Sequence, residues 1–140
     1  MHIHSECRDP FIYKTGADGI ANAAGRTVKR IRDSRLGLVG LGRIGTAVAV
    51  RAKSFGFSIS FYDPYKEDGY EKALGVKRCE TIEALFKTSD CVSLHCNCTN
   101  ENKNMINTRL FEQMPIGSML VNTARGELVD EVVFNIFVLP

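Results

Sequence analysis

The stretch LGLVGLGRIG, residues 36–45, joins a short apolar run to a glycine-rich turn. Its glycines, Gly40, Gly42 and Gly45, have the GxGxxG spacing that links the first strand and helix of a dinucleotide-binding unit. There the first glycine permits the tight turn, the second lets the backbone approach a pyrophosphate, and the third allows close packing of helix on strand. Free amides and the helix dipole then face the ligand. The stretch predicts a phosphate-binding loop, with an ordinary glycine turn as the alternative.

A second predicted strand, residues 58–62, ends at Asp63, eighteen residues after Gly45. An acid at this distance is expected to accept hydrogen bonds from the adenosine ribose of a dinucleotide. Because its carboxylate accepts a 2′-hydroxyl and repels a 2′-phosphate, NAD is the predicted cofactor rather than NADP. The pair Asp63-Pro64 is also typical of a turn that ends a strand, and both interpretations can hold together.

Strand and helix patterns alternate along the rest of the chain. Behind the glycine loop, Ile44, Ala47, Val48, Ala52 and Phe55 recur at helical spacing and predict a helix over residues 43–55 whose apolar stripe covers a sheet. Further predicted elements are a short helix ending at residue 75, a strand over 76–79, a helix over 81–89, a strand over 91–95, a helix over 109–114 and a strand over 119–122. The alternation predicts an α/β fold, a Rossmann-type doubly wound parallel sheet that is incomplete at its C-terminal side.

Sheets of this kind bind ligands beyond the carboxyl ends of their strands. The glycine loop, Asp63, residues 95–99 and residues 122–126 all follow predicted strands. We therefore expect these segments to converge on one crevice.

The composition is that of a globular protein with one domain: 140 residues and a formal net charge of +2. The positive excess is N-terminal, where a basic run occurs at Arg26, Lys29, Arg30, Arg32 and Arg35. This run is compatible with a basic interaction module for nucleic acid or acidic proteins, but no aromatic residues interleave with it, and a solvated connector is the preferred interpretation. No stretch resembles a signal peptide or a bilayer-spanning segment, so we expect no membrane association.

The cysteines predict buried thiols in a reducing compartment rather than disulfides, because their number is odd and Cys79, Cys91, Cys96 and Cys98 fall in or near predicted strands. Two groups could suggest a metal: His95 with Cys96 and Cys98, and His2 with His4 and Cys7. Neither has a second ligand pair at zinc-like spacing, so no metal site is expected.

Several ordered motifs, RIRDSRLGLVGLGRIG, SFGFSISFYDPY, SDCVSLHC and LVNTARGELVDE, together resemble the NAD-binding domain of the D-isomer-specific 2-hydroxyacid dehydrogenases. Within that family they are similar to the C-terminal-binding proteins, which are NAD-regulated transcriptional corepressors. The resemblance covers about residues 30–131, which leaves residues 1–29 as a loose N-terminal arm and residues 132–140 as a divergent apolar tail. It implies a nuclear or cytoplasmic location, a homodimer or a heterodimer with a full-length family member, and transcription factors as partners.

The resemblance also assigns site residues. It implies that the pyrophosphate is held by Gly40, Gly42, Arg43, Ile44 and Gly45, and the adenosine ribose by Asp63. It places Cys96, Asn97 and Thr99 along the path from adenosine to nicotinamide, and Thr123, Ala124 and Arg125 beside the nicotinamide. Asn97 departs from the proline that many family members have at this position.

Arg125 occupies the position of the family's substrate arginine and is the candidate catalytic residue. A guanidinium there can bind the carboxylate of a 2-keto acid and polarise the carbonyl that receives hydride. The alternative is a turn residue in a surface salt bridge.

The family's catalytic glutamate and histidine come from segments after the helix that begins near Asp130, and the resemblance gives His95 a cofactor contact instead. General acid–base catalysis typically contributes about 10²–10⁴ in rate, so we expect NAD binding with little turnover from a truncated chain. The alternative is an NAD-dependent oxidoreductase that reduces a small 2-keto acid. Without further strands, we expect strand 119–122 to be a bare sheet edge beside the apolar tail.

Overall fold

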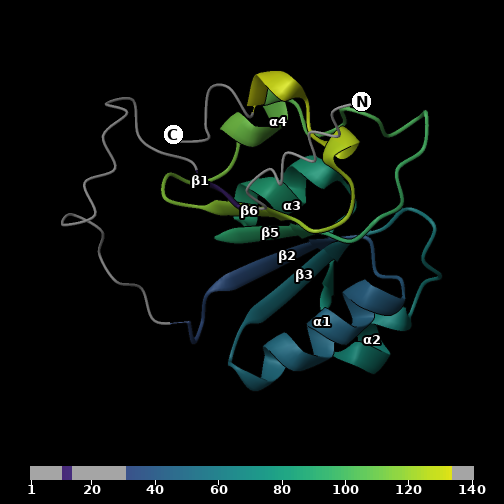
Figure 1. The fold of residues 1–140 in the computed structure, drawn as a ribbon. Helices are drawn as coiled ribbons and strands as arrows, with labels where there is room; N and C mark the ends of the chain where they lie inside the picture. Colours follow the sequence, from purple (N-terminus) through teal and green to yellow (C-terminus); the bar gives the residue numbers. More distant parts are fainter. Residues whose placement is uncertain (1–10, 14–30, 134–140) are drawn as a thin grey trace, which may run out of the picture.

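The computed structural model describes residues 11–13 and 31–133, which form one sheet with helices on both faces (Figure 1). The spatial order of the strands is β1-β6-β5-β2-β3-β4. Their bounds are β1 Phe11–Tyr13, β2 Arg35–Val39, β3 Ser58–Tyr62, β4 Lys77–Arg78, β5 Cys91–Leu94 and β6 Met119–Asn122. Strands β2 to β6 pair in parallel, and in chain order they lie 3-2-1-4-5. This order is that of a Rossmann sheet and confirms the predicted fold class.

The helices connect the strands and cover the sheet. They are α1 Arg43–Ser54, α2 Tyr70–Leu74, α3 Ile82–Thr88, α4 Thr108–Glu112 and the 3-10 helix η1 Gly126–Leu128. Figure 1 shows α1 and α2 on one face and α3 and α4 on the other. Thr81 caps α3 by accepting a hydrogen bond from the amide of Ala84 at 3.2 Å. No helix among the described residues is long and apolar enough to cross a bilayer.

Two buried clusters hold the layers together, one on each face. The first contains Leu36, Leu38 and Phe61 with residues of α1, and the second contains Val39 with residues of α3, α4, β5 and β6. Alternate residues of β2 therefore serve opposite faces, as a central strand requires.

Helix α1 corrects one prediction from the sequence. Its buried residues are Gly45, Ala49 and Ala52, whereas Ile44 is 67% exposed and Phe55 is 68% exposed. The predicted apolar stripe is thus wrong at both ends. Small residues at positions i, i+4 and i+7 let the helix backbone approach the sheet closely, which hydrophobicity alone does not indicate.

The edge of β6 corrects another prediction. It is not bare, because β1 pairs with it antiparallel in the register Phe11 to Val121, Ile12 to Leu120 and Tyr13 to Met119. Residues 11–13 belong to the predicted loose arm, and a strand of three residues is too short to show a periodic pattern. The rest of that arm, and the tail from residue 134, lie outside the described residues.

Candidate cofactor-binding site

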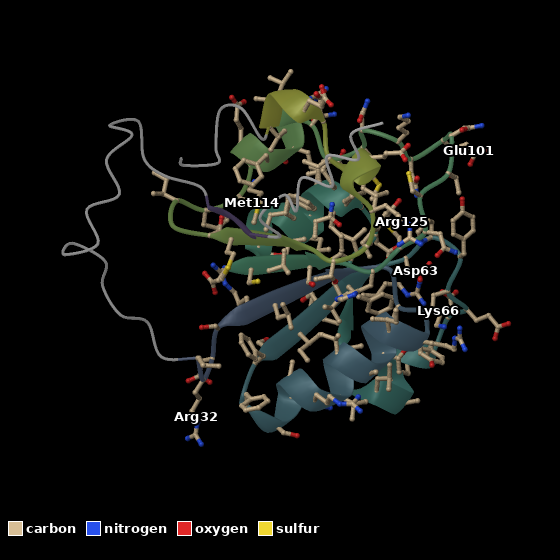
Figure 2. All side chains as sticks on the ribbon, viewed as in Figure 1. Arg32, Asp63, Lys66, Glu101, Met114 and Arg125 are labelled. Carbon is tan, nitrogen blue, oxygen red and sulfur yellow. The ribbon has the colours of Figure 1, made fainter. Side chains whose placement is uncertain are left out.

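A cavity of about 710 Å³ opens at the carboxyl ends of β2, β3 and β5. This volume is within the range of about 300–1,000 Å³ that ligand pockets usually have. Three of the four segments predicted to converge contribute to it: the glycine loop, Asp63 with its turn, and residues 95–99. Predicted site residues in its lining are Gly40, Gly42, Arg43, Ile44, Asp63, Cys96, Asn97 and Thr99. Figure 2 shows Asp63 at this edge of the sheet, with Arg32 at the opposite edge.

The three glycines of the loop have three different surroundings. Gly40 has φ +92° and a Cβ there would lie 2.8 Å from the amide nitrogen of Cys96, so this turn needs glycine. A Cβ at Gly45 would collide with the carbonyl oxygen of Gly40, which explains the close packing of α1 on the loop. A Cβ at Gly42 would meet nothing within 4 Å. Gly42 therefore borders open space, where a pyrophosphate can approach the backbone.

The first turn of α1 is suited to an anion. Gly42 is the N-cap residue, no side chain caps the helix, and the first turn contains no acid. The first amides of a helix have no partner within the helix, and its dipole makes this end positive. Arg43 adds a formal charge at the cavity wall. These features fit a phosphate group.

Asp63 connects the end of β3 to the glycine loop. One carboxylate oxygen accepts a hydrogen bond from the amide of Leu41 at 2.8 Å, and the other accepts one from the amide of Tyr65 at 3.0 Å. The second bond confirms the turn interpretation of Asp63. Because each carboxylate oxygen has more than one acceptor direction, both oxygens can still bind ribose hydroxyls.

The wall formed by residues 95–102 is organised by Asn102, which the sequence analysis missed. Its side-chain oxygen accepts from the amide of Thr99 at 2.7 Å, and its side-chain nitrogen donates to the carbonyl of Asn97 at 2.7 Å. An Asn three residues after Thr99, in a segment rich in Asn and Thr, is a turn signal that could have indicated it. Other lining residues that no sequence motif assigns to the site are Val39, Tyr62, Pro64, Tyr65, Glu101 and Met105.

His95 and Cys96 line the same cavity in their uncharged forms. Burial lowers the pKa of His95, whose Nε2 lies 2.9 Å from the Ser93 hydroxyl oxygen. Burial likewise raises the pKa of the Cys96 thiol. Neutral groups here leave the positive charge of the site to Arg43 and the helix terminus.

The predicted nicotinamide residues Thr123, Ala124 and Arg125 follow β6 at the same sheet edge, but they are not among the residues that line the cavity. Asn122 holds their turn by accepting from the amide of Ala124 at 3.1 Å and donating to the carbonyl of Arg125 at 2.8 Å. The exposed guanidinium of Arg125 donates to the carbonyl of Ala124 at 2.8 Å. Its predicted catalytic role stays a prediction.

The remaining candidate groups can be placed only in part. Among the described residues no three His, Cys, Asp or Glu side chains are arranged to hold a metal, and Cys79, Cys91, Cys96 and Cys98 are free thiols of intermediate exposure. His2, His4 and Cys7 lie outside the described residues, as do Arg26, Lys29 and Arg30. Arg35, from the basic run, pairs with Asp90 through nitrogens at 2.8 and 3.0 Å.

An open glycine loop, an uncapped helix terminus and an acid at the end of the next strand define a dinucleotide-binding module. The model of the family "D-isomer specific 2-hydroxyacid dehydrogenase, NAD binding domain" matches residues 12–135. The chain belongs to this family, and its cofactor is NAD. The match confirms the resemblance and extends beyond residues 30–131 at both ends.

The chain is similar to several proteins of this family that have different names. The chain is 44% identical over 117 residues to C-terminal-binding protein 1 of Caenorhabditis elegans, which covers 83% of this chain and 16% of that protein. It is 47% identical over 96 residues to glyoxylate reductase of Korarchaeum cryptofilum, covering 69% and 29%. The apo structure of D-lactate dehydrogenase from Escherichia coli matches with a TM-score of 0.71 and 38% identity, covering 78% and 34%. The chain thus spans less than a third of either curated relative.

Proposed function

We propose that this chain binds NAD(H) as the nucleotide-binding part of a corepressor of the C-terminal-binding-protein type. The observation that carries the proposal is the hydrogen bond from Leu41 to Asp63, beside the open space over Gly42. It holds the predicted pyrophosphate and ribose subsites together in one preformed unit. The corepressor assignment is supported by 44% identity over 83% of the chain to C-terminal-binding protein 1.

In this proposal the described residues bind and orient the cofactor. The amides at the start of α1 and the Arg43 guanidinium hold the pyrophosphate, while the Asp63 carboxylate accepts hydrogen bonds from the ribose. Bound NAD(H) supplies the hydride chemistry, and the protein supplies position and electrostatics. Residues 123–125 lie beside the nicotinamide.

Turnover by the described residues alone is expected to be very slow. A catalytic histidine normally has a group that orients it, commonly a carboxylate. Within residues 31–133 the His95 ring is bonded to the Ser93 hydroxyl, and no carboxylate is hydrogen-bonded to it. We therefore assign His95 to cofactor contact and not to proton transfer.

The partners and location follow from the same proposal. They are a second copy or a full-length family member, transcription factors, and a nuclear or cytoplasmic compartment. Size-exclusion chromatography with light scattering, with and without NADH, tests the dimer. Imaging of the tagged chain tests the location, and confinement to another organelle would contradict it.

The second candidate is an oxidoreductase that reduces a small 2-keto acid. It is favoured by the 47% identity to a glyoxylate reductase and by Arg125 at the site edge. A spectrophotometric assay of NADH oxidation with pyruvate and glyoxylate separates the two proposals. Binding of NADH without oxidation supports the first, whereas turnover that disappears in Arg125→Ala supports the second.

A further inference from the structure

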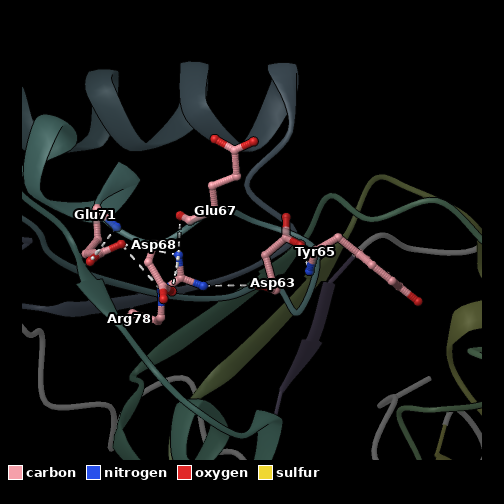
Figure 3. A network of polar contacts seen from close by, with 7 residues as sticks. Asp63, Tyr65, Glu67, Asp68, Glu71 and Arg78 are labelled. Atoms are coloured by element: carbon pink, nitrogen blue, oxygen red, sulfur yellow. Dashed lines mark hydrogen bonds and ion pairs between the residues drawn. The ribbon is translucent and has the colours of Figure 1, made fainter.

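The loop that carries Asp63 is held by one arginine on the neighbouring strand. Arg78, at the end of β4, donates to the carbonyl of Glu67 at 2.7 Å and makes a longer hydrogen bond to the carbonyl of Asp63 at 3.4 Å. Its side chain is 17% exposed. Figure 3 shows this guanidinium between Asp63 on one side and Glu71 on the other. One side chain thus bridges both ends of the turn that follows β3.

The guanidinium is itself fixed in place. Its carbon lies 5.0 Å from the centroid of the Phe61 ring, which belongs to the core. A terminal nitrogen of Arg78 donates to one carboxylate oxygen of Glu71 at 3.2 Å. The other oxygen of Glu71 accepts from the amide of Gly69 at 3.1 Å. Since its side chain is largely buried and its donors point at three acceptors, Arg78 has little freedom to turn toward a ligand.

The contacts of Asp63 depend on where this loop lies. Its carboxylate reaches Leu41 of the glycine loop and Tyr65 of its own turn, at 2.8 and 3.0 Å. The Tyr65 bond forms within the turn itself, whereas the Leu41 bond requires the Asp63 backbone to stay close to the end of β2. We propose that Arg78, paired with Glu71, is a positioning residue that keeps the Asp63 carboxylate against the glycine loop and thereby sets the preference for NAD over NADP.

The physical reason is the difference between the two cofactors. A fixed carboxylate accepts hydrogen bonds from the 2′-hydroxyl and repels a 2′-phosphate, whereas a carboxylate on a loosened loop can turn away from either group. Loosening the loop is therefore expected to weaken NAD binding more than NADP binding. The inference rests on the proposed binding of NAD(H) at the glycine loop.

The decisive variant is Arg78→Lys, because it keeps the charge but replaces the planar guanidinium fork with a compact ammonium that cannot span acceptors on both sides of it. We expect calorimetric titration to show NAD binding weakened about three- to tenfold, with a smaller change for NADP. The ratio of the NADP dissociation constant to the NAD dissociation constant should therefore decrease. A merely structural role would lower the melting temperature and leave this ratio unchanged.

Glu71→Gln and Asp68→Asn form a matched pair for the partner of Arg78. Each removes one negative charge near Arg78, Glu71 from the first turn of α2 and Asp68 from the loop before it, but Asp68 is fully exposed and lies 3.9 Å from the Arg78 nitrogen. We expect the ratio of the NADP to the NAD dissociation constant to decrease in Glu71→Gln and to stay at the wild-type value in Asp68→Asn. An equal decrease of this ratio in both variants would assign the effect to charge alone and overturn the positioning role.

Amide hydrogen exchange gives a readout that needs no ligand. In Arg78→Lys the amides of Leu41 and Tyr65 should exchange faster, while those of β5 keep their wild-type rates. Unchanged exchange at Leu41 and Tyr65, or an unchanged NAD to NADP ratio in a wild type that binds NAD, would overturn this inference alone. Absence of NAD binding by the wild type would instead overturn the proposed function, and this inference with it.

Discussion

Two segments that end at the same sheet edge differ in how they are held. The first segment runs from β2 to β3. Its glycine loop, helix α1 and Asp63 contact one another through backbone atoms and one carboxylate. In the second, from β6 to η1, the turn at residues 123–125 is held by the Asn122 side chain, and the Arg125 guanidinium donates to the neighbouring carbonyl. The first segment lines the cavity, and residues 123–125 do not.

Under the proposed function, the glycine-loop half of the site is therefore preformed, while residues 123–125, the half that would carry chemistry, lie outside the cavity lining. A site fixed by backbone packing is ready to bind, because little has to be reordered when the ligand arrives. Binding without rapid turnover is the behaviour expected of such an arrangement. Substitutions and truncations in each of the two segments can break or sharpen this contrast.

The largest effect is expected from Gly45→Val, compared with Gly126→Ala in the second segment. A side chain at Gly45 would collide with the Gly40 carbonyl oxygen, whereas one at Gly126 would meet nothing within 4 Å. We expect Gly45→Val to lower the free energy of unfolding by at least about 3 kcal/mol and Gly126→Ala to change it by less than about 0.5 kcal/mol. Urea unfolding followed by circular dichroism measures both. Equal losses would show that the segments are equally constrained.

Asp63→Ala should have the next largest effect, on affinity. The carboxylate is expected to make charge-assisted hydrogen bonds of about 1.5–3 kcal/mol, so NAD binding should weaken roughly ten- to a hundredfold. Calorimetric titration of NAD measures this loss, with Asp68→Asn as an exposed control in the same loop. A loss of less than about threefold would reduce Asp63 to a turn residue.

Removal of residues 1–13 should have a smaller effect, confined to the second segment. It deletes β1 and leaves the edge of β6 unpaired, which is expected to cost about 1–2 kcal/mol of stability and to promote association. Removal of residues 1–10, which keeps β1, is the control. Light scattering and urea unfolding compare them, and identical behaviour of the two truncations would mean that β1 does not protect the edge.

The smallest effect concerns pH. Burial lowers the pKa of His95 below its ordinary value of 6.5, so the unfolded chain binds the proton more readily than the folded chain does. The contribution of His95 to the free energy of unfolding should therefore be fully present above pH 6.5. It should decrease as the pH falls from 6.5 toward the lower pKa of the folded state. His95→Gln should reduce the difference in unfolding free energy between about pH 7.5 and about pH 5.5, and a variant with the wild-type difference would contradict this.

The sequence predicted those parts of the fold that depend on local pattern. Strands β3 and β6 have the predicted bounds, and Asp63 lies beside the glycine loop because both follow adjacent parallel strands. The cofactor was predictable for the same reason, since glycine spacing and an acid at the next strand end reflect one topology.

The features that the sequence predicted wrongly, or did not predict, depend on three-dimensional contacts. The exposure of Ile44 and Phe55 follows from close backbone packing at Gly45, Ala49 and Ala52, which a count of apolar residues does not show. Strand β1 forms through pairing with a distant edge. The role of Asn102 depends on a loop whose path was unknown.

The most direct measurement is calorimetric titration of NAD into the wild type and into Gly42→Val. Gly42 has φ −74° and free space around it, so the variant should fold with nearly wild-type stability while its side chain occupies the space proposed for the pyrophosphate. We predict measurable NAD binding by the wild type and none by the variant, with similar melting temperatures. Equal binding by both proteins would contradict the proposal that the pyrophosphate lies on the glycine loop.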